Sequence, residues 1–410
     1  MRIDAKCEAQ KKDWGKMQLK VFRLLVIANR YYPFVKSQVD SLKNHFEKVC
    51  VILLTARVPK FLSKFSFMNP RWRRDAFAYN YKYDNVEVYF ARHFTLPFDS
   101  SRKKRGDAVF KVVTKIIQKE RIEFDLIHAH FTYPSGYVGA RLKEGYDKPL
   151  IITGHGYDVY DLPFRNAEWN KKIRSVLNTA DYILTPSKSN YDKLVQLDIS
   201  EENVCIIPNG YEQNVFKNIL SSKAKEKLDL PEDKKIILSV GNLELIKGHK
   251  YLIEAIKEVV KREKNITCLI VGSGSEKKDL INLIDRLNLN NYIKLVGRRP
   301  HKEIPLWMNA CDVFVLPSLN EGNPTVMFEA LGCGKPFIGT NVGGIPEIIT
   351  NKKLGIIVKP EEVNALADAI LKALDKDWDK DYILNYAKQY SWDKIAAKII
   401  GIYNELLEKE

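Results

Sequence analysis

Two glutamates on either side of a helix-start signal are the side chains of this 410-residue chain that most directly suggest chemistry. They are Glu321 and Glu329 in the stretch EGNPTVMFE, and the dipeptide Asn323-Pro324 stands between them. Asn is a preferred helix cap and Pro suits the first helical position, so we predict that TVMFEALGCG runs as a helix until its glycines end it. Glu321 then precedes the helix, and Glu329 lies inside it, about 7–8 Å along the axis from Pro324.

The start of this helix is suited to a negatively charged ligand. Free backbone N–H groups and the positive end of the helix dipole favour a diphosphate there. Carboxylates are pure acceptors, so Glu321 can bind the hydroxyls of a donor sugar and Glu329 those of a ribose. The alternative is that the two glutamates are solvated acids on either side of a capped helix, and the spacing alone leaves both interpretations open. On the first interpretation the donor also contacts Gly322, Asn323, Pro324, Thr325 and Val326.

The elements that must position these residues follow a repeating pattern. Short β-branched runs alternate with helical segments, which is typical of a parallel α/β architecture. We expect strands at 23–30, 49–55, 86–94, 124–131, 150–155, 182–187 and 204–210, and then at 235–242, 267–274, 292–298, 312–318, 335–340 and 355–360. The series starts twice, so we predict two Rossmann-like, doubly wound domains whose strand-end loops face a shared cleft.

The domain limits follow from where the series restarts. We expect an N-terminal extension at 1–20, a first Rossmann-like domain at 21–215 and a second Rossmann-like domain at 216–390. The amphipathic segment at about 391–410 is expected to form a helix that crosses back to the first domain; packing on its own domain is the alternative.

The charge is uneven along the chain. The formal net charge is +15; residues 1–150 hold 30 Lys and Arg against 15 Asp and Glu, whereas residues 151–410 hold 36 of each. Basic clusters at 71–74 (RWRR) and 102–105 (RKKR) are interleaved with aromatic residues. They form either a solvated basic face or a surface for an anionic partner, such as a membrane leaflet or a polyprenyl phosphate. No nucleic-acid-binding motif accompanies them, so we expect no nucleic-acid partner.

The chain has no stretch of about 18 uninterrupted apolar residues, and its first residues lack the apolar core of a signal peptide. We therefore expect a cytoplasmic protein, able to act at the inner face of the membrane. The six cysteines follow no CxxC or disulfide spacing and are expected to be reduced and buried. They are Cys7, Cys50, Cys205, Cys268, Cys311 and Cys333.

A longer block around the paired acids resembles a known family. PSLNEGNPTVMFEALGCGKPFIGTNVGGIPEII (317–349) is similar to the signature of retaining glycosyltransferases of family four, which have the GT-B fold. It carries the E-x7-E pair, a turn reading LGCGKP and a loop reading VGGIPE. Further similarity lies at 128–142, 206–216 and 240–255, and the resemblance spans about residues 22–405.

The resemblance makes the first domain the acceptor domain and the second the nucleotide-sugar domain, and it implies an activity. It is the transfer of a sugar, with retention of configuration, from a UDP- or GDP-linked donor to a hydroxyl of a glycan or lipid-linked acceptor. Cell-surface polysaccharide, glycolipid and glycoprotein glycan synthesis are the processes it suggests. It implies no metal and no other cofactor, because backbone amides, a helix dipole and a lysine can stabilise the diphosphate.

Several residues outside the helix segment are candidates for the same site. Lys247 follows a strand and can hold the diphosphate and stabilise the leaving group, although an exposed lysine is the simpler interpretation. His155 ends a strand, where it can either hydrogen-bond the donor sugar or serve as a satisfied structural histidine, and the resemblance makes it the counterpart of the family's active-site histidine. The remaining donor candidates are Gly241, Asn242, Gly297 and Arg298, and the acceptor or cleft candidates are His130, Lys36, Ser37 and Tyr157.

Two departures from the family pattern concern the donor site. Asn242 stands where the family usually has an arginine, which removes one cation. The segment after the first strand, NRYYPFVKSQVDSL (29–42), lacks the usual glycine pair. His128 and His130 point to one face of a strand; we expect His130 to line the cleft and His128 to support it, with a metal pair as the alternative.

Other functions stay open at this stage. A sugar-nucleotide epimerase of similar fold would convert the donor without an acceptor. A non-catalytic protein would bind the sugar nucleotide and never turn over. A dinucleotide oxidoreductase would use the turn GSGSE (272–276), but a lone Gly-x-Gly is weak evidence.

Overall fold

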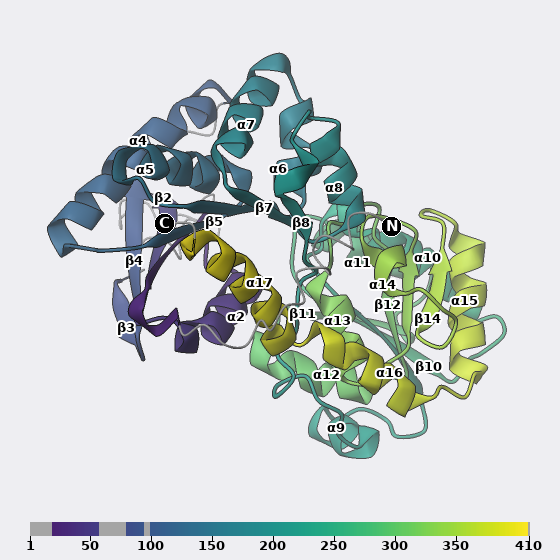
Figure 1. Ribbon diagram of the computed structural model, residues 1–410. Coiled ribbons are helices and arrows are strands. Elements are labelled where there is room, and N and C mark those ends of the chain that lie inside the picture. Colours follow the sequence, from purple (N-terminus) through teal and green to yellow (C-terminus); the bar gives the residue numbers. More distant parts are fainter. Residues whose placement is uncertain (1–18, 57–78, 94–98, 409–410) are drawn as a thin grey trace. The chain divides into compact units, whose positions relative to one another are not determined.

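The structure of the chain is a computed structural model that describes residues 19–56, 79–93 and 99–408, without the side chains of 19, 56 and 99–103. The chain forms two compact units (Figure 1). The first comprises the described residues up to Pro208 together with those from Ala396 onward, and the second is Asn209–Ile395. The sequence analysis placed the boundary between the two domains at residues 215 and 216, and the start of the returning C-terminal helix at about residue 391.

The first unit is built on an eight-stranded sheet in the order β3-β4-β2-β1-β5-β6-β7-β8. All pairs are parallel except β3, an edge strand that runs antiparallel to β4. The predicted strands are confirmed, and β3 is the one that the sequence analysis missed. The strands are β1 Arg23–Ala28, β2 Lys48–Ala56, β3 Tyr81–Tyr83, β4 Val86–His93, β5 Leu126–His130, β6 Leu150–Thr153, β7 Tyr182–Thr185 and β8 Val204–Ile206.

Helices cover both faces of this sheet. Helices α4, α5 and α7 lie on one face, and α2 and α17 lie on the other (Figure 1). The helices of this unit are α2 Pro33–Leu42, α4 Asp99–Glu120, α5 Tyr137–Tyr146, α6 Tyr157–Tyr160, α7 Ala167–Thr179 and α8 Lys188–Val195. Asn166 and Ser187 cap α7 and α8 by accepting backbone N–H groups, which is why these helices begin where they do.

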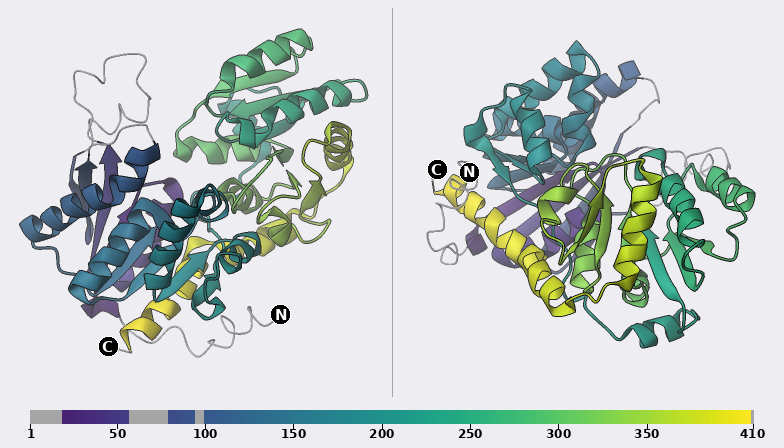
Figure 2. Two further views of the ribbon diagram at one scale, coloured as in Figure 1. Left: turned by 90° about the horizontal axis from the view of Figure 1, so that it is seen from above. Right: turned by 90° about the vertical axis from the view of Figure 1, so that its right-hand side faces the viewer.

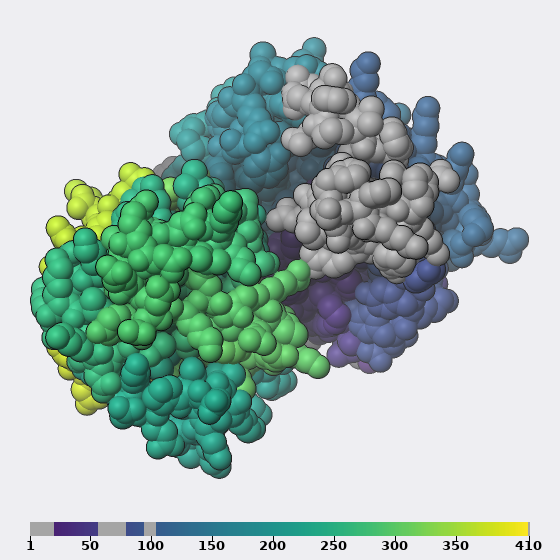
Figure 3. Space-filling view, turned by 180° about the vertical axis from the view of Figure 1, so that it is seen from behind, coloured from purple at the N-terminus to yellow at the C-terminus, as the bar shows by residue number. Residues whose placement is uncertain are grey.

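The second unit holds a six-stranded parallel sheet in the order β11-β10-β9-β12-β13-β14. Its strands confirm the second predicted series: β9 Lys235–Val240, β10 Ile266–Val271, β11 Ile293–Gly297, β12 Val313–Leu316, β13 Phe337–Thr340 and β14 Gly355–Val358. Its helices are α9 Ser221–Lys227, α10 His249–Val259, α11 Lys277–Arg286, α12 Ile304–Ala310, α13 Thr325–Gly332, α14 Ile345–Ile348, α15 Val363–Asp375 and α16 Lys380–Ala387. The green part of the chain, which includes α11 and α12, forms much of the face of this unit seen in Figure 3.

Side-chain alternation along β12 explains why this sheet has a core on both faces. Phe314 and Leu316 join the apolar cluster under α12, α13 and α16, whereas Val313 and Val315 join the cluster under α10, α11 and α15. Successive residues of a strand point to opposite faces, so a run without polar residues needs helices on both. Figure 2 shows the helices on either side of each sheet from two further directions.

The C-terminal helix α17, Trp392–Leu407, links the two units. It starts in the second unit, and from Ala396 onward it belongs to the first. There the hydroxyl of Tyr403 lies 2.5 Å from Nδ1 of the buried His128, and the hydroxyl of Tyr182 donates to Glu405 at 2.8 Å. The predicted return of this helix to the first domain is therefore confirmed.

Candidate functional site

The paired acids lie where the strand order of the second sheet reverses. Strands β9 and β12 are neighbours there, and ligands of open α/β sheets bind at the carboxyl ends of strands beside such a reversal. The loop after β9 carries Lys247, and the loop after β12 carries Glu321. The adjacency of the two strands thus brings together two loops that are 74 positions apart in the sequence.

Glu321 is 7% exposed and is held by two donors. Its Oε1 accepts from Nζ of Lys247 at 2.6 Å and from the hydroxyl of Ser318 at 2.6 Å. Ser318 is itself fixed, because its carbonyl oxygen accepts from Thr340 at 2.5 Å. The interpretation of two solvated acids is therefore wrong for Glu321, since the carboxylate is buried beside a cation.

Two glycines set the approach of the neighbouring loops. A Cβ on Gly248, whose φ is +65°, would lie 2.1 Å from the carbonyl oxygen of Pro317. A Cβ on Gly343, whose φ is +52°, would lie 1.9 Å from that of Glu321. Only glycine fits both the space and the left-handed backbone. The VGGIPE loop thus packs directly on the backbone that carries Glu321.

The predicted helix is confirmed, but its cap is not the predicted one. Helix α13 is preceded by Pro324 at the cap position, and no side chain caps it. Asn323 instead bonds Asn209: its Oδ1 accepts the Asn209 N–H at 3.0 Å, and its carbonyl oxygen accepts from the Asn209 amide at 2.7 Å. The helix ends at Gly332 as expected, because Gly334 adopts a φ of +71°.

Glu329 is also paired inside the protein. It is 5% exposed, and its Oε1 lies 2.8 Å from Nε2 of His301. Burial lowers the pKa of His301, but the hydrogen bond to Glu329 and its charge raise it more, so the net pKa lies above the ordinary value. The sequence analysis missed His301. Its position three residues after the donor candidate Arg298 was the available signal.

The other donor candidates lie in loops at the same sheet edge. Gly241 and Asn242 follow β9, and Asn242 is exposed. Gly297 ends β11 with a φ of +81°, and Arg298 after it is exposed. The segment 322–326 connects Glu321 to the first turn of α13, in which the N–H of Met327 donates to the carbonyl oxygen of Pro324 at 3.1 Å.

The GSGSE turn has a structural explanation. A Cβ on Gly272 would lie 1.8 Å from the carbonyl oxygen of Gly241, and one on Gly274 would lie 2.1 Å from that of Leu243. The backbone N–H of Glu276 also donates to Leu243 at 2.9 Å. Packing between two loops therefore accounts for these glycines, without a dinucleotide.

In the first unit, His130 and His155 are brought together. They lie at and just beyond the ends of the neighbouring strands β5 and β6, and Nδ1 of His130 is 3.0 Å from Nε2 of His155. His130 is fully buried, so in this structure it supports His155 and does not itself line a surface. Burial lowers the pKa of His130 to about 3 and lowers that of His155 well below its ordinary value.

The backbone at His155 is fixed by a buried acid that the sequence analysis did not single out. Asp158 accepts the N–H groups of Thr132, His155 and Gly156 at 2.8, 3.0 and 3.0 Å. Its carboxylate is 1% exposed, and burial raises its pKa. Asp158 thus ties the loop after β6 to the loop after β5.

Aromatic rings occupy the segment where the family's glycine pair is missing. Tyr32 and Phe34 are stacked with centroids 5.4 Å apart, and Phe34 lies 4.8 Å from the ring of His155. Phe131 lies 4.7 Å from His155 on another side. The segment after β1 therefore contacts the candidate histidine through side chains.

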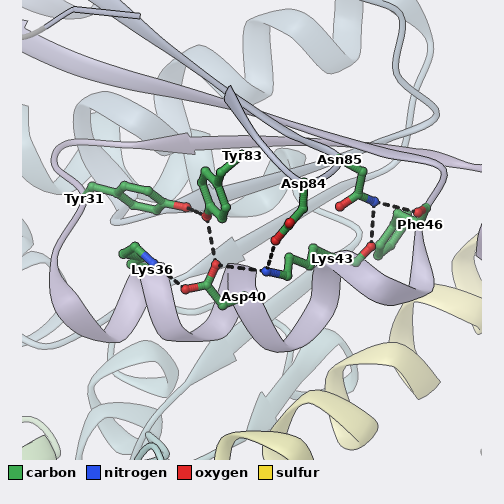
Figure 4. A network of polar contacts seen from close by, with 8 residues as sticks. All are labelled: Tyr31, Lys36, Asp40, Lys43, Phe46, Tyr83, Asp84 and Asn85. Atoms are coloured by element: carbon green, nitrogen blue, oxygen red, sulfur yellow. Dashed lines mark hydrogen bonds and ion pairs between the residues drawn. The ribbon is translucent and has the colours of Figure 1, made fainter. Parts of the chain in front are cut away.

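The remaining candidates of the first unit have partners of their own. Lys36 bonds Asp40 at 2.5 Å in a network that joins helix α2 to Tyr83 on strand β3 (Figure 4). The hydroxyl of Ser37 is buried and donates to Pro33 at 2.9 Å. Tyr157 is 49% exposed at the start of α6.

The alternative of a metal pair at His128 is not favoured. Its Nδ1 lies 2.5 Å from the Tyr403 hydroxyl, and its Nε2 lies 2.7 Å from that of Thr153, so both ring nitrogens are engaged. Within the described residues, no group of three or more His, Cys, Asp or Glu is arranged to hold a metal ion. The aspartate-rich stretch at 375–381 contains the cap of α16, since Asp379 accepts the N–H of Tyr382 at 2.9 Å.

Some sequence-based expectations concern residues that the structure does not describe. The cluster at 71–74, the extension at 1–18, Cys7 and the side chains of Arg102 and Lys103 lie outside the described part. Cys50, Cys205, Cys268, Cys311 and Cys333 are free and buried, as predicted. Within 19–56, 79–93 and 99–408, no helix combines the length and the apolar character that crossing a membrane requires.

Comparison with known proteins places this geometry in a family. Residues 221–397 match the model of "Glycosyl transferases group 1", and residues 67–214 match that of "Glycosyltransferase Family 4". An uncharacterized glycosyltransferase of Methanocaldococcus jannaschii is 30% identical over 334 residues, which cover 79% of this chain and 86% of the relative. TuaC of Bacillus subtilis, a candidate glycosyltransferase of teichuronic acid biosynthesis, is 31% identical over 289 residues, which cover 70% of this chain and 71% of the relative.

A solved structure agrees with the fold. Anabaena HepE in complex with UDP superposes with a TM-score of 0.73 at 21% identity, covering 94% of this chain and 100% of that one. This chain therefore shares its fold with that structure. From the family models and the relatives together, the chain belongs to the group 1 glycosyl transferases, glycosyltransferase family 4, and is a glycosyltransferase.

Proposed function

We propose that the protein transfers a sugar from a UDP- or GDP-linked donor to an acceptor hydroxyl with retention of configuration, and that the second unit binds the donor. One observation carries the proposal. Two carboxylates at and inside the start of helix α13 are buried, and each is hydrogen-bonded to a basic side chain: Glu321 to Lys247 at 2.6 Å, and Glu329 to His301 at 2.8 Å. Buried charges in proteins are paired, and paired buried acids beside a sheet edge that binds ligands are candidates for ligand binding.

The donor sugar is assigned to Glu321. Its Oε1 is taken by Lys247 and Ser318, and no described residue hydrogen-bonds its Oε2, so that oxygen can accept from a sugar hydroxyl. Glu329 is assigned to the ribose hydroxyls in the same way, with His301 fixing Oε1. The diphosphate is assigned to the first turn of α13, where the helix dipole and the N–H groups of Thr325 and Val326 favour negative charge, while the N–H of Met327 donates to Pro324 at 3.1 Å.

Catalysis is assigned to stabilisation of the leaving group. The ammonium of Lys247 has three donors, of which Glu321 takes one, and the side chain is 24% exposed. It can therefore also contact the diphosphate and lower the barrier as negative charge develops there. Both glutamates are assigned to donor binding, so neither is the nucleophile; a departing phosphate oxygen assists removal of the acceptor proton on the same face.

The acceptor side is assigned to the first unit, with His155 close to the donor sugar. A relative named for teichuronic acid biosynthesis supports a surface polysaccharide, and the UDP complex of the Anabaena protein supports a nucleoside diphosphate. The excess of 15 positive charges in residues 1–150 supports a lipid-linked acceptor at an anionic membrane. Binding of the protein to vesicles with and without anionic lipid, at low and high salt, tests the proposed association with an anionic membrane.

The donor is tested first by a thermal shift with UDP-, GDP- and ADP-sugars. Because a ligand at about 100 times its Kd stabilises the folded protein by about 2.7 kcal/mol, the correct donor should raise the melting temperature measurably. The best donor is then assayed with lipid-phosphate and glycan acceptors. Release of the nucleoside diphosphate that depends on an acceptor supports transfer, whereas conversion of the donor with no acceptor would support the epimerase.

Two variants test the assigned roles. Lys247→Ala should lower kcat by about 100-fold, the scale of losing one charge-stabilising donor, and should disturb folding less than turnover, although it also lowers the melting temperature because the buried Glu321 carboxylate loses its cation. Lys250→Ala, a lysine three positions later with its ammonium 4.5 Å from the ring of Tyr251, is the matched control. Glu329→Ala should weaken donor binding; an unchanged donor Kd would remove Glu329 from the site.

A further inference from the structure

A cluster of aromatic side chains lies at one edge of the first sheet. The strand order reverses between β1 and β5, which are neighbours although β2, β3 and β4 lie between them in the sequence. Ligands of open α/β sheets bind at the carboxyl ends of the strands beside such a reversal. Tyr32 and Phe34 follow β1, and Phe131 follows β5 directly. These three residues, here called the aromatic platform, therefore lie where the topology of the first unit favours a ligand.

The rings of the aromatic platform pack on one another and still reach the surface. The rings of Tyr32 and Phe34 are parallel to within 4°, with centroids 5.4 Å apart, which is the geometry of an offset stack. The ring of Phe131 is tilted against both, with centroids 5.6 and 6.4 Å away. Tyr32 is 36% exposed, and the other two residues are partly exposed. Phe34 and Phe131 also contact the ring of His155, so the platform is continuous with the candidate site.

The segment that carries Tyr32 is fixed by hydrogen bonds of the residues before it. The side-chain amide of Asn29 donates to the carbonyl oxygen of Tyr133 at 3.1 Å, which ties the segment to the loop after β5. The hydroxyl of Tyr31 lies 2.8 Å from that of Tyr83, which ties it to the edge strand β3 (Figure 4). The platform is thus held in place by the protein itself, and such preorganisation lowers the entropic cost of binding a ligand.

The backbone of Phe131 is strained. Its φ of +75° and ψ of 141° lie outside the regions that a bulky residue normally adopts. The other non-glycine residues with positive φ in 19–56, 79–93 and 99–408 are Asp, Asn, Glu or Arg, so Phe131 is the one aromatic residue there with this conformation. Its N–H donates to Thr153 at 2.8 Å, and its carbonyl oxygen accepts from Gly136 at 2.9 Å, so bonds on both sides impose the strain. Such strain is concentrated at functional sites and ligand clamps.

The chemistry beside the platform suits a neutral ligand that carries hydroxyl groups. Lys36 stands one helical turn after Tyr32, and its ammonium is paired with Asp40 at 2.5 Å. The pair has no net charge, yet the ammonium has three N–H groups, of which Asp40 takes one. The C–H groups on one face of a sugar ring form a flat apolar surface with a small positive charge. That surface packs on the negative face of an aromatic ring, while the hydroxyls at its edge accept from nearby donors.

We propose that the aromatic platform binds a neutral sugar ring of the acceptor, and that Tyr32 is a specificity-determining residue that favours this ring over a charged polyol or a lipid chain. The choice of a sugar ring follows from the first unit alone. Its assignment to the acceptor rests on the proposed function, in which the donor binds to the second unit. A free glycan and a lipid-linked glycan present the same ring, so the platform recognises the ring in either.

The direct test is saturation-transfer NMR of the full chain with the methyl pyranosides of glucose, galactose, mannose and N-acetylglucosamine, each with and without UDP and GDP. The ring protons of at least one glycoside should receive saturation from the protein. Tyr32→Phe should keep this signal within about twofold. Tyr32→Leu keeps an apolar side chain but no ring, so it should reduce the signal at least about fivefold.

Tyr146→Leu is the matched control. Tyr146 is 38% exposed, packs on the ring of Phe124 at 5.1 Å and ends α5 before β6 begins, at the opposite edge of the sheet. Its loss should leave glycoside binding unchanged. Absence of glycoside binding to the wild-type protein would overturn the proposal. Equal binding by Tyr32→Leu and the wild type would also overturn it, because a ligand that needs only apolar contact, such as a lipid chain, tolerates leucine.

Kinetics decide which substrate the platform holds. With the donor and acceptor identified by the screens above, Tyr32→Leu should raise the acceptor KM by about tenfold and leave the donor KM within about twofold. A raised donor KM with an unchanged acceptor KM would place the donor sugar on the platform and would overturn its assignment to the acceptor. The free and the lipid-linked form of the same glycan, compared as acceptors, should show the same rise in KM, because the ring is common to both.

The platform and the proposed function fail separately. Glycoside binding that depends on Tyr32, without any transfer of sugar, would refute the proposed function and leave the platform. Transfer with an acceptor KM that Tyr32→Leu does not change would refute the platform and leave the function. Should the Leu variant not fold, as judged by its melting temperature, nuclear Overhauser contacts between sugar C–H protons and the Tyr32 ring of the wild type still decide: their presence supports the platform, and their absence overturns it.

Discussion

Replacing Tyr403 by Phe removes one hydroxyl group that joins helix α17 to the centre of the first sheet. That hydroxyl is 2.5 Å from Nδ1 of His128, and both side chains are fully buried. The phenyl ring of the variant keeps the edge contact with Phe46, whose centroid lies 5.7 Å away. The substitution therefore removes a single hydrogen bond and little apolar contact.

The size of the effect follows from the burial of the remaining partner. No water can replace the lost hydroxyl at Nδ1 of His128, and an unsatisfied buried polar group costs about 1–3 kcal/mol. For a unit of this size, about 2–4 °C of melting temperature is lost for each kcal/mol. We expect the first unit to lose about 1–3 kcal/mol of unfolding free energy and about 2–12 °C.

Urea unfolding followed by circular dichroism, together with a thermal scan, measures this loss. Tyr182→Phe is the matched control, because its hydroxyl also bonds α17, at 2.8 Å from Glu405, but at a partly exposed position. Water can replace that bond, so the control should lose about 1 kcal/mol or less. Equal losses in the two variants would refute the reasoning that the buried histidine bond secures α17.

Two further predictions concern the second unit. Gly343→Ala should reduce both the melting temperature and donor binding, because the new Cβ would lie 1.9 Å from the carbonyl oxygen of Glu321. A thermal scan with and without donor measures both effects, and an unchanged donor affinity would contradict the prediction. The pair of His301 and Glu329 should contribute stability that depends on pH. The folded-state pKa of His301 is raised, so this contribution is fully present below about pH 6.5 and is lost as pH rises through the raised value. Urea unfolding of wild type and of His301→Gln from pH 5.5 to 9 should therefore show a difference in unfolding free energy that shrinks as the pH rises. A difference that stays constant over this range would exclude the charged pair.

Much of the fold could be predicted because its signals are local. Runs such as KIILSV and VFVL are predominantly apolar and rich in Ile and Val, which favours strands buried on both faces. The ends of α13 were also predictable in part: its start near Pro324 and its stop at Gly332 depend on backbone preferences of single residues. The short strand β3, with the sequence YKY, was missed because three residues, of which Tyr81 and Lys82 are exposed, carry no alternation that distinguishes a strand from a loop.

The chemistry of the site could be predicted only as far as residue types allowed. Glu321, Glu329 and Lys247 were found from spacing and from family resemblance. Their partners were not, since nothing near Glu329 in the sequence indicates His301, and nothing near Asn323 indicates that it bonds Asn209 instead of capping a helix.

The sequence by itself determined which segments are strands and helices and which polar residues end them, because these depend on neighbours within a few positions. The tertiary structure decided which of those polar residues meet. Lys247 reaches Glu321 because β9 lies beside β12, and His130 reaches His155 because β5 lies beside β6. Strand order is set by packing over the whole unit, so no local pattern carries that information.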